Sequence, residues 1–130
     1  MRCLLDTHVF LWLAAADERL PAGCVELFED TKNDFVLSRA SVWEMAIKQS
    51  LGRLKLGRSL AGLIELAIEE QGLGLLGIEL AHVAHVASLP FHHHDPFDRL
   101  LVAQALIEGL PLLSDKPVFD DYGVLRIWPA

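Results

Sequence analysis

Short apolar runs alternate with longer stretches of helical periodicity along the whole chain, and this alternation most restricts its fold. The short runs predict strands at 3–5, 35–37, 73–78, 112–113 and 124–127. The intervening stretches predict helices at 9–16, 22–32, 42–51, 60–71, 81–89 and 96–108. Strands joined by crossover helices form a mostly parallel sheet, and strands this apolar are covered on both faces. The sequence therefore predicts an α/β fold.

The length of 130 residues suits one domain, residues 1–130, and a hydrophobic content of 52% supplies a core without a disulfide or structural metal. The two cysteines, Cys3 and Cys24, are too few for a disulfide framework, and we expect buried thiols in a reducing compartment. Asp6 and His8 interrupt what would be the apolar part of a secretory signal, and no run of 18 apolar residues exists. We therefore expect a cytoplasmic protein without a membrane-spanning helix.

Four acidic residues fall at equivalent positions of the predicted sheet. Asp6 and Asp115 follow strands, whereas Glu44 and Asp98 lie near the starts of crossover helices. Because crossover helices begin at the carboxyl edge of a parallel sheet, all four side chains should face one edge, where ligands bind in such folds. Carboxylates gathered in one pocket repel each other unless a cation is bound, and oxygen ligands favour Mg²⁺ or Mn²⁺. Such ions can activate a water and stabilise the charge that develops during phosphodiester hydrolysis. The pattern therefore indicates a metal-dependent nuclease.

Each acid also has a structural interpretation. Asp6 and Asp115 can simply be polar residues that end strands, and Ser41 to Glu44 matches the S-x-x-E capping box. In the run Asp95-Pro96-Phe97-Asp98, Asp95 fits the N-cap, Pro96 fits the first helical residue, and Asp98 fits an acid at N3 that favours the helix dipole. We therefore expect Asp95 to cap the helix and Asp98 to be free for the metal.

Several segments together resemble the PIN-domain proteins of the VapC toxin type. They are residues 4–8 (LLDTH), 41–48 (SVWEMAIK), 95–105 (DPFDRLLVAQA), 113–115 (LSD) and 122–128. The resemblance covers essentially the whole chain, and the third segment is the most specific part of it. It implies a PIN-like three-layer sandwich, with a central, mostly parallel sheet between helices.

In function, the resemblance implies a Mg²⁺- or Mn²⁺-dependent endoribonuclease, the toxin of a type II toxin–antitoxin pair. Its partners would be an RNA substrate, a cognate antitoxin and a second copy of the chain. The resemblance maps the family's catalytic and metal-binding acids onto Asp6, Glu44, Asp98 and Asp115. It gives Thr7 and Asp95 supporting roles.

The net charge of −7 argues against binding polyanions through overall charge, but it leaves room for a local basic site. Residues 45–64 contain no acid and four cations, Lys48, Arg53, Lys55 and Arg58. This segment is either a solvated turn or a ridge that guides RNA phosphates toward Glu44. We expect these four residues, together with Arg99, to bind substrate. Trp12, Trp43 and Phe97 recur at helical spacing and are expected in the core.

Other motifs are weaker. The run Gly72 to Gly77 matches G-x-G-x-x-G, but it enters a strand instead of a helix, contrary to a dinucleotide site. His82, His85 and the run His92 to Asp95 raise the question of zinc. The three histidines of that run, His92, His93 and His94, have no evident role. A phosphomonoesterase would need a second Asp two residues after the first, where His8 stands. A metal-free RNA- or protein-binding module remains the alternative outside enzymology.

Overall fold

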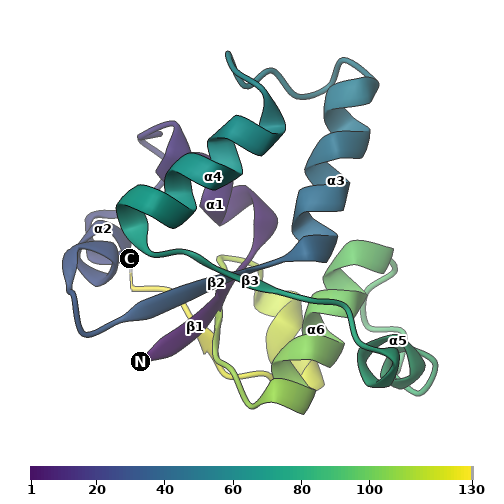
Figure 1. Cartoon of the computed structure of the whole chain (residues 1–130). Coiled ribbons are helices and arrows are strands. Elements are labelled where there is room, and N and C mark those ends of the chain that lie inside the picture. The colour runs from purple at the N-terminus through teal and green to yellow at the C-terminus, as the bar shows by residue number, and fades with distance from the viewer. Residues whose placement is uncertain (130) are drawn as a thin grey trace.

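The computed structural model describes residues 1–129, which contain a five-stranded sheet (Figure 1). In chain order the strands are β1 (Arg2–Leu5), β2 (Asp34–Ser38), β3 (Gly74–Leu76), β4 (Leu112–Leu113) and β5 (Arg126–Ile127). Their spatial order is β3-β2-β1-β4-β5, and every neighbouring pair is parallel. The predicted α/β fold with a parallel sheet is therefore confirmed, and β1 lies at its centre.

Helices cover both faces of this sheet. They are α1 (Thr7–Ala14), α2 (Ala22–Glu29), α3 (Arg39–Ser50), α4 (Leu60–Gln71), α5 (Leu80–Val86), α6 (Pro96–Glu108) and the 3-10 helix η1 (Pro117–Tyr122). Figure 1 shows α1 to α4 on one side of the strands and α5 and α6 on the other. The predicted three-layer arrangement is thus confirmed.

The alternating direction of side chains along each strand produces two separate cores. Cys3 and Leu5 of β1 point into a cluster with residues of α1, α2, α3 and α4. Leu4 points the opposite way, into a cluster with α6 and η1. All three side chains are fully buried, which explains why β1 is continuously apolar.

The ends of α4 and α6 agree with the sequence prediction, and each helix is followed by a glycine with positive φ, Gly72 and Gly109. The start of α3 differs. Ser38 is its N-cap, and the Ala40 backbone N–H donates to the Ser38 hydroxyl oxygen over 3.0 Å. Ser41 therefore lies inside the helix, and the alternative interpretation of Ser41 and Glu44 as a capping box is wrong. Glu44 is thereby released from the structural role that competed with metal binding.

Cys3 and Cys24 are both free and buried, as expected from the sequence. Burial raises the pKa of the Cys3 thiol to about 12 and that of Cys24 to about 11. Both are therefore core residues. Across residues 1–129, no helix combines the length and the apolar character needed to cross a membrane.

Candidate active site

Three of the four predicted acids meet at the carboxyl edge of the sheet. Asp6 directly follows β1, Asp115 lies two residues beyond β4, and Asp98 occupies the first turn of α6. The carboxylates of Asp6 and Asp98 are buried, whereas that of Asp115 is 37% exposed. Two cationic side chains join them: Lys116 contacts Asp6 and Asp98, and His8 contacts Asp6 and Asp115. The predicted convergence of these three acids is therefore observed. The acids are connected through the side chains of Lys116 and His8, which lie between them.

Asp6 is the acid at the centre of this group. The Ser114 hydroxyl donates to Asp6 Oδ2 over 2.6 Å, and His8 Nδ1 lies 3.4 Å from Asp6 Oδ1. Burial opposes ionisation of Asp6, but the close contact and charge of His8, the charge of Lys116 and the Ser114 hydroxyl outweigh it. The pKa of Asp6 is consequently lowered, and the side chain is a carboxylate at neutral pH.

His8 was not assigned a functional role from the sequence, yet it connects two of the acids. Its Nε2 atom contacts Asp115 Oδ1, and its ring packs edge-on against Trp12. Burial lowers the pKa of His8, but Asp6 and then Asp115 raise it by more, so the net shift favours the imidazolium. Position 8, where a phosphomonoesterase of the type considered would have a second aspartate, is thus occupied by a histidine that pairs with Asp115.

Asp98 has a different electrostatic environment from Asp6. Its Oδ2 atom lies 2.9 Å from Lys116 Nζ and 2.8 Å from His93 Nε2. Burial and the negative charge of Asp6 raise the pKa of Asp98, and Lys116 and His93 only partly offset them. Two acids that share one site thus have pKa values displaced in opposite directions. The contact with Asp98 also locates one residue of the histidine run for which the sequence indicated no role.

The neighbouring Asp95 has the capping role predicted for it. It is the N-cap of α6, and the Asp98 backbone N–H donates to Asp95 Oδ1 over 2.9 Å. Pro96 follows at the first helical position, where its missing N–H has no cost. The local sequence therefore leaves the Asp98 side chain free to enter the site.

Glu44 is buried on α3, where its Oε2 atom lies 3.0 Å from Lys48 Nζ. Thr7 donates through its hydroxyl to the Ser41 hydroxyl over 2.8 Å, which connects the start of α1 to α3 one turn before Glu44. Thr7 therefore supports the relative position of the two helices.

Two carboxylate oxygens fit the predicted Mg²⁺ or Mn²⁺. Within residues 1–129, Asp6 Oδ1 and Glu44 Oε1 are buried and accept no hydrogen bond, although His8 Nδ1 lies 3.4 Å from Asp6 Oδ1. A buried anionic oxygen without a partner is costly, and a divalent cation would satisfy it. In the same range no three His, Cys, Asp or Glu side chains are grouped closely enough to hold an ion as they stand. Lys116 and His8 occupy the space between the acids instead.

The predicted substrate-binding cations fall into two groups. Lys48, Arg53, Lys55 and Arg58 are exposed, on α3 and on the connection to α4. Arg99 is buried, and it donates to the carbonyl oxygens of Val86, Leu89 and Pro90 over 2.8 to 3.2 Å. The expectation that Arg99 binds substrate is therefore replaced by a structural role, because its donors already hold the loop that carries His93.

Two further assignments from the sequence change. Trp43, expected in the core, is 59% exposed and packs edge-on against Phe97 with ring centroids 5.2 Å apart. His82, considered for zinc, is buried and accepts the Glu79 backbone N–H at Nδ1 in a capping box of α5. A helical period identifies which residues share a face but not whether that face is covered.

Like His8 and His93, Lys116 and Ser114 are site residues to which the sequence analysis gave no role. Both flank Asp115 at the end of β4, so they lie at the same sheet edge as the acids. That placement was available from the sequence. The direction of each side chain was not, because it depends on the turn after the strand.

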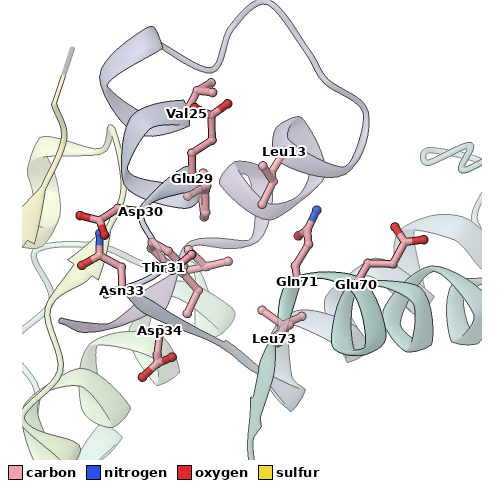
Figure 2. Close-up of a pocket in the computed structure, with 14 residues that line it drawn as sticks. Leu13, Val25, Glu29, Asp30, Thr31, Asn33, Asp34, Glu70, Gln71 and Leu73 are labelled. Atoms are coloured by element: carbon pink, nitrogen blue, oxygen red, sulfur yellow. The ribbon is translucent and has the colours of Figure 1, made fainter.

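One sizeable cavity lies elsewhere. It has a volume of about 480 Å³, and none of the four predicted acids lines it. Figure 2 shows its lining from α1, α2 and the end of α4, including Asp34 at the start of β2 and Leu73 before β3. These positions mark the amino edge of the sheet, whereas ligands of such folds bind at the carboxyl edge. The chemistry of the acids therefore identifies the candidate site better than cavity size does.

Solved structures with the same fold cover nearly the whole chain. VapBC2 from Rickettsia felis, bound to a DNA fragment from its promoter, matches with 12% identity and a TM-score of 0.71 over 98% of each chain. DNA-bound VapBC from Salmonella typhimurium matches with 15% identity and a TM-score of 0.68, over 98% of this chain and 97% of that one. FitAcB from Neisseria gonorrhoeae matches with 18% identity and a TM-score of 0.63, over 98% and 96%. At these identities the likeness concerns the fold.

No curated protein sequence matches the chain. The sequence model of the PIN domain, by contrast, matches residues 3–125, a range that contains all four predicted acids. With the parallel sheet, the acids at its carboxyl edge and this match, the chain belongs to the PIN domain family.

Proposed function

We propose that this protein is a metal-dependent endoribonuclease that acts as the toxin of a toxin–antitoxin pair. The observation that supports it most directly is that the buried carboxylates of Asp6 and Asp98 meet at the carboxyl edge of the sheet, and that buried oxygens of Asp6 and Glu44 accept no hydrogen bond. PIN domains are typically nucleases, and the solved structures of the same fold carry the names VapBC and FitAcB. The sequence resemblance to VapC-type toxins agrees with both.

In this proposal Asp6, Glu44, Asp98 and Asp115 form the catalytic and metal-binding set. A bound Mg²⁺ or Mn²⁺ would supply positive charge for the phosphodiester and lower the pKa of an attacking water. Asp6 contributes a carboxylate that His8 and Ser114 orient and keep ionised. Asp98 is oriented by His93, and Asp115 by His8. Asp115 is the most exposed of the three acids at the edge, and in this proposal it faces the entering substrate.

RNA recognition in the proposal depends on a local basic surface. Lys48, Arg53, Lys55 and Arg58 are exposed on and after the helix that carries Glu44. In a chain of net charge −7, these residues would attract phosphates toward the acids while the rest of the molecule repels them. The partners proposed are RNA, a cognate antitoxin and a second copy of the chain, in the cytoplasm.

The test is RNA cleavage by the purified protein with saturating Mn²⁺ or Mg²⁺. Asp6→Asn keeps the size of the side chain but removes its charge, and we expect cleavage to fall by ~100-fold or more. Asp17→Asn is a matched control, because Asp17 pairs with Arg19 at the surface outside the site. Both variants should keep the wild-type circular dichroism spectrum.

Two results would contradict the proposal. One is equal cleavage by Asp6→Asn and wild type, or cleavage that survives a chelator. The other is RNA binding by the wild type without any cleavage, which is the behaviour of a metal-free binding module.

A further inference from the structure

Lys116 holds a place between two buried acids that come from different elements. Its Nζ atom lies 2.9 Å from Asp98 Oδ2 and 3.9 Å from Asp6 Oδ2. The two carboxylates are 4% and 1% exposed, whereas the lysine side chain is 38% exposed. The ammonium group is therefore the cation that the end of β1 and the start of α6 share.

The backbone after β4 directs Lys116 to this place. The Lys116 backbone N–H donates to the Ser114 hydroxyl oxygen over 3.0 Å, and the same hydroxyl donates to Asp6 Oδ2. Arg126 Nη1 adds a bond to the Ser114 carbonyl oxygen over 3.2 Å. The turn is thus tied to Asp6 itself, and Lys116 extends from it across to Asp98. Asp115, between them in sequence, is directed to His8 instead.

Electrostatics explains why a cation is needed here. Two ionised carboxylates that are buried close together repel each other strongly. Burial also removes the solvent screening that would otherwise reduce this repulsion. A divalent ion removes the repulsion, and so does an ammonium group at hydrogen-bond distance. The lysine therefore satisfies in the metal-free protein the same requirement that an ion would satisfy in the loaded one.

We propose that Lys116 is a built-in counter-ion that competes with the metal: a divalent ion held by Asp6 and Asp98 would have to displace its ammonium group. This inference rests on the proposed function, since it concerns the same acids. It has two consequences. The metal-free domain is stable because Lys116 neutralises the site, and metal affinity is lower than the acids alone would provide.

The first experiment uses metal-free protein and thermal melting. Lys116→Met removes the charge and keeps the length of the side chain, and we expect the melting temperature to fall by roughly 5 °C. Adding Asp98→Asn to that variant removes the repulsion between Asp6 and Asp98 and should recover part of the lost melting temperature. Asp98→Asn alone should not raise the melting temperature. Lys55→Met, at an exposed position, is the matched control and should leave the melting temperature unchanged.

The second experiment measures Mn²⁺ binding by calorimetry without RNA. Lys116→Met should bind Mn²⁺ ~10-fold more tightly than wild type, because the competing charge is gone. Its melting temperature should also rise more on addition of Mn²⁺. Lys55→Met should bind like wild type. If Lys116 instead contacts RNA phosphates, Lys116→Met will leave Mn²⁺ affinity unchanged, and the inference fails.

The outcomes separate this inference from the proposed function. Equal Mn²⁺ binding by wild type, Asp6→Asn and Lys116→Met would mean that the metal does not bind at this edge. That result would overturn both the metal site and the competition with Lys116. Weaker binding by Asp6→Asn alone would support the metal site and overturn only the competition. Additive effects of Lys116→Met and Asp98→Asn in metal-free buffer would overturn the counter-ion role, whatever the nuclease assay finds.

Discussion

At the residue scale, two aspartates three positions apart have different tasks. Asp95 accepts the Asp98 backbone N–H and caps α6, whereas the Asp98 side chain enters the site between Lys116 and His93. The pKa of Asp98 is raised by burial and by Asp6, so ionising this group costs folding free energy instead of adding to it. Removing the charge of Asp98 should therefore spare stability, whereas removing the cap should not.

The matching prediction compares Asp95→Ala with Asp98→Asn. Asp95→Ala should cost about 1 kcal/mol of helix-cap stability and lower the melting temperature by ~4 °C, while RNA cleavage remains appreciable. Asp98→Asn should lose metal-dependent cleavage with little change in melting temperature. Thermal melts and cleavage with saturating Mn²⁺ check both variants. An inactive Asp95→Ala beside an active Asp98→Asn would reverse the two assignments.

At the element scale, α3 and the connection after it carry the exposed cations of the proposed RNA surface. The connection runs between α3 and α4 on the side of the molecule seen at the top of Figure 1. Its Arg53, Lys55 and Arg58 are exposed, and Lys48 precedes them on α3 beside Glu44. In the proposed function these cations would attract the phosphate chain of the RNA toward Glu44 on α3.

We therefore predict that Arg53, Lys55 and Arg58 changed together to Ala will weaken RNA binding. Each phosphate contact to single-stranded nucleic acid contributes about 0.7 to the slope of log affinity against log salt, so three lost contacts should flatten it by ~2. A filter-binding salt titration of an RNA oligonucleotide with the metal-free protein measures this slope. The triple variant Glu65, Glu69 and Glu70 to Gln on α4 controls for charge change elsewhere. A slope equal to wild type would mean that the connection is only a solvated turn.

At the scale of the whole molecule, several large apolar side chains remain exposed on a small domain. On α5, Leu80 and Val83 are 83% and 51% exposed, and Phe91 in the following loop is exposed as well. Apolar surface of this kind commonly marks a contact with another chain. It agrees with the homodimer and the antitoxin that the proposed function includes.

The prediction at this scale concerns mass in solution. We expect light scattering at micromolar concentration to give about twice the chain mass of 14.4 kDa. Burying the apolar surface lowers the free energy of the pair, so dilution should shift the mass toward that of one chain. A mass of 14.4 kDa at every concentration tested would contradict the homodimer.

The sequence by itself determined the architecture and most of the acidic set. Hydrophobic periodicity is a local property, so the strands around Leu4 and Val36 and the helices of residues 60–71 and 96–108 were predicted correctly. The order of strands and helices then places Asp6, Asp98 and Asp115 at one sheet edge, because crossover helices start where parallel strands end. The capping role of Asp95 also follows from its neighbours in sequence.

Only the tertiary structure decided what those acids contact. Arg99 can face RNA or can donate to backbone carbonyl oxygens. Which of the two occurs depends on the segment from the end of α5 to Pro90, nine or more residues before Arg99. The exposure of Trp43 depends on whether another element covers its face of α3. Lys116 reaches Asp98, and Asp115 turns to His8, because Ser114 ties the turn after β4 to Asp6. Side-chain partners are set by packing between distant segments, and no local pattern encodes that packing.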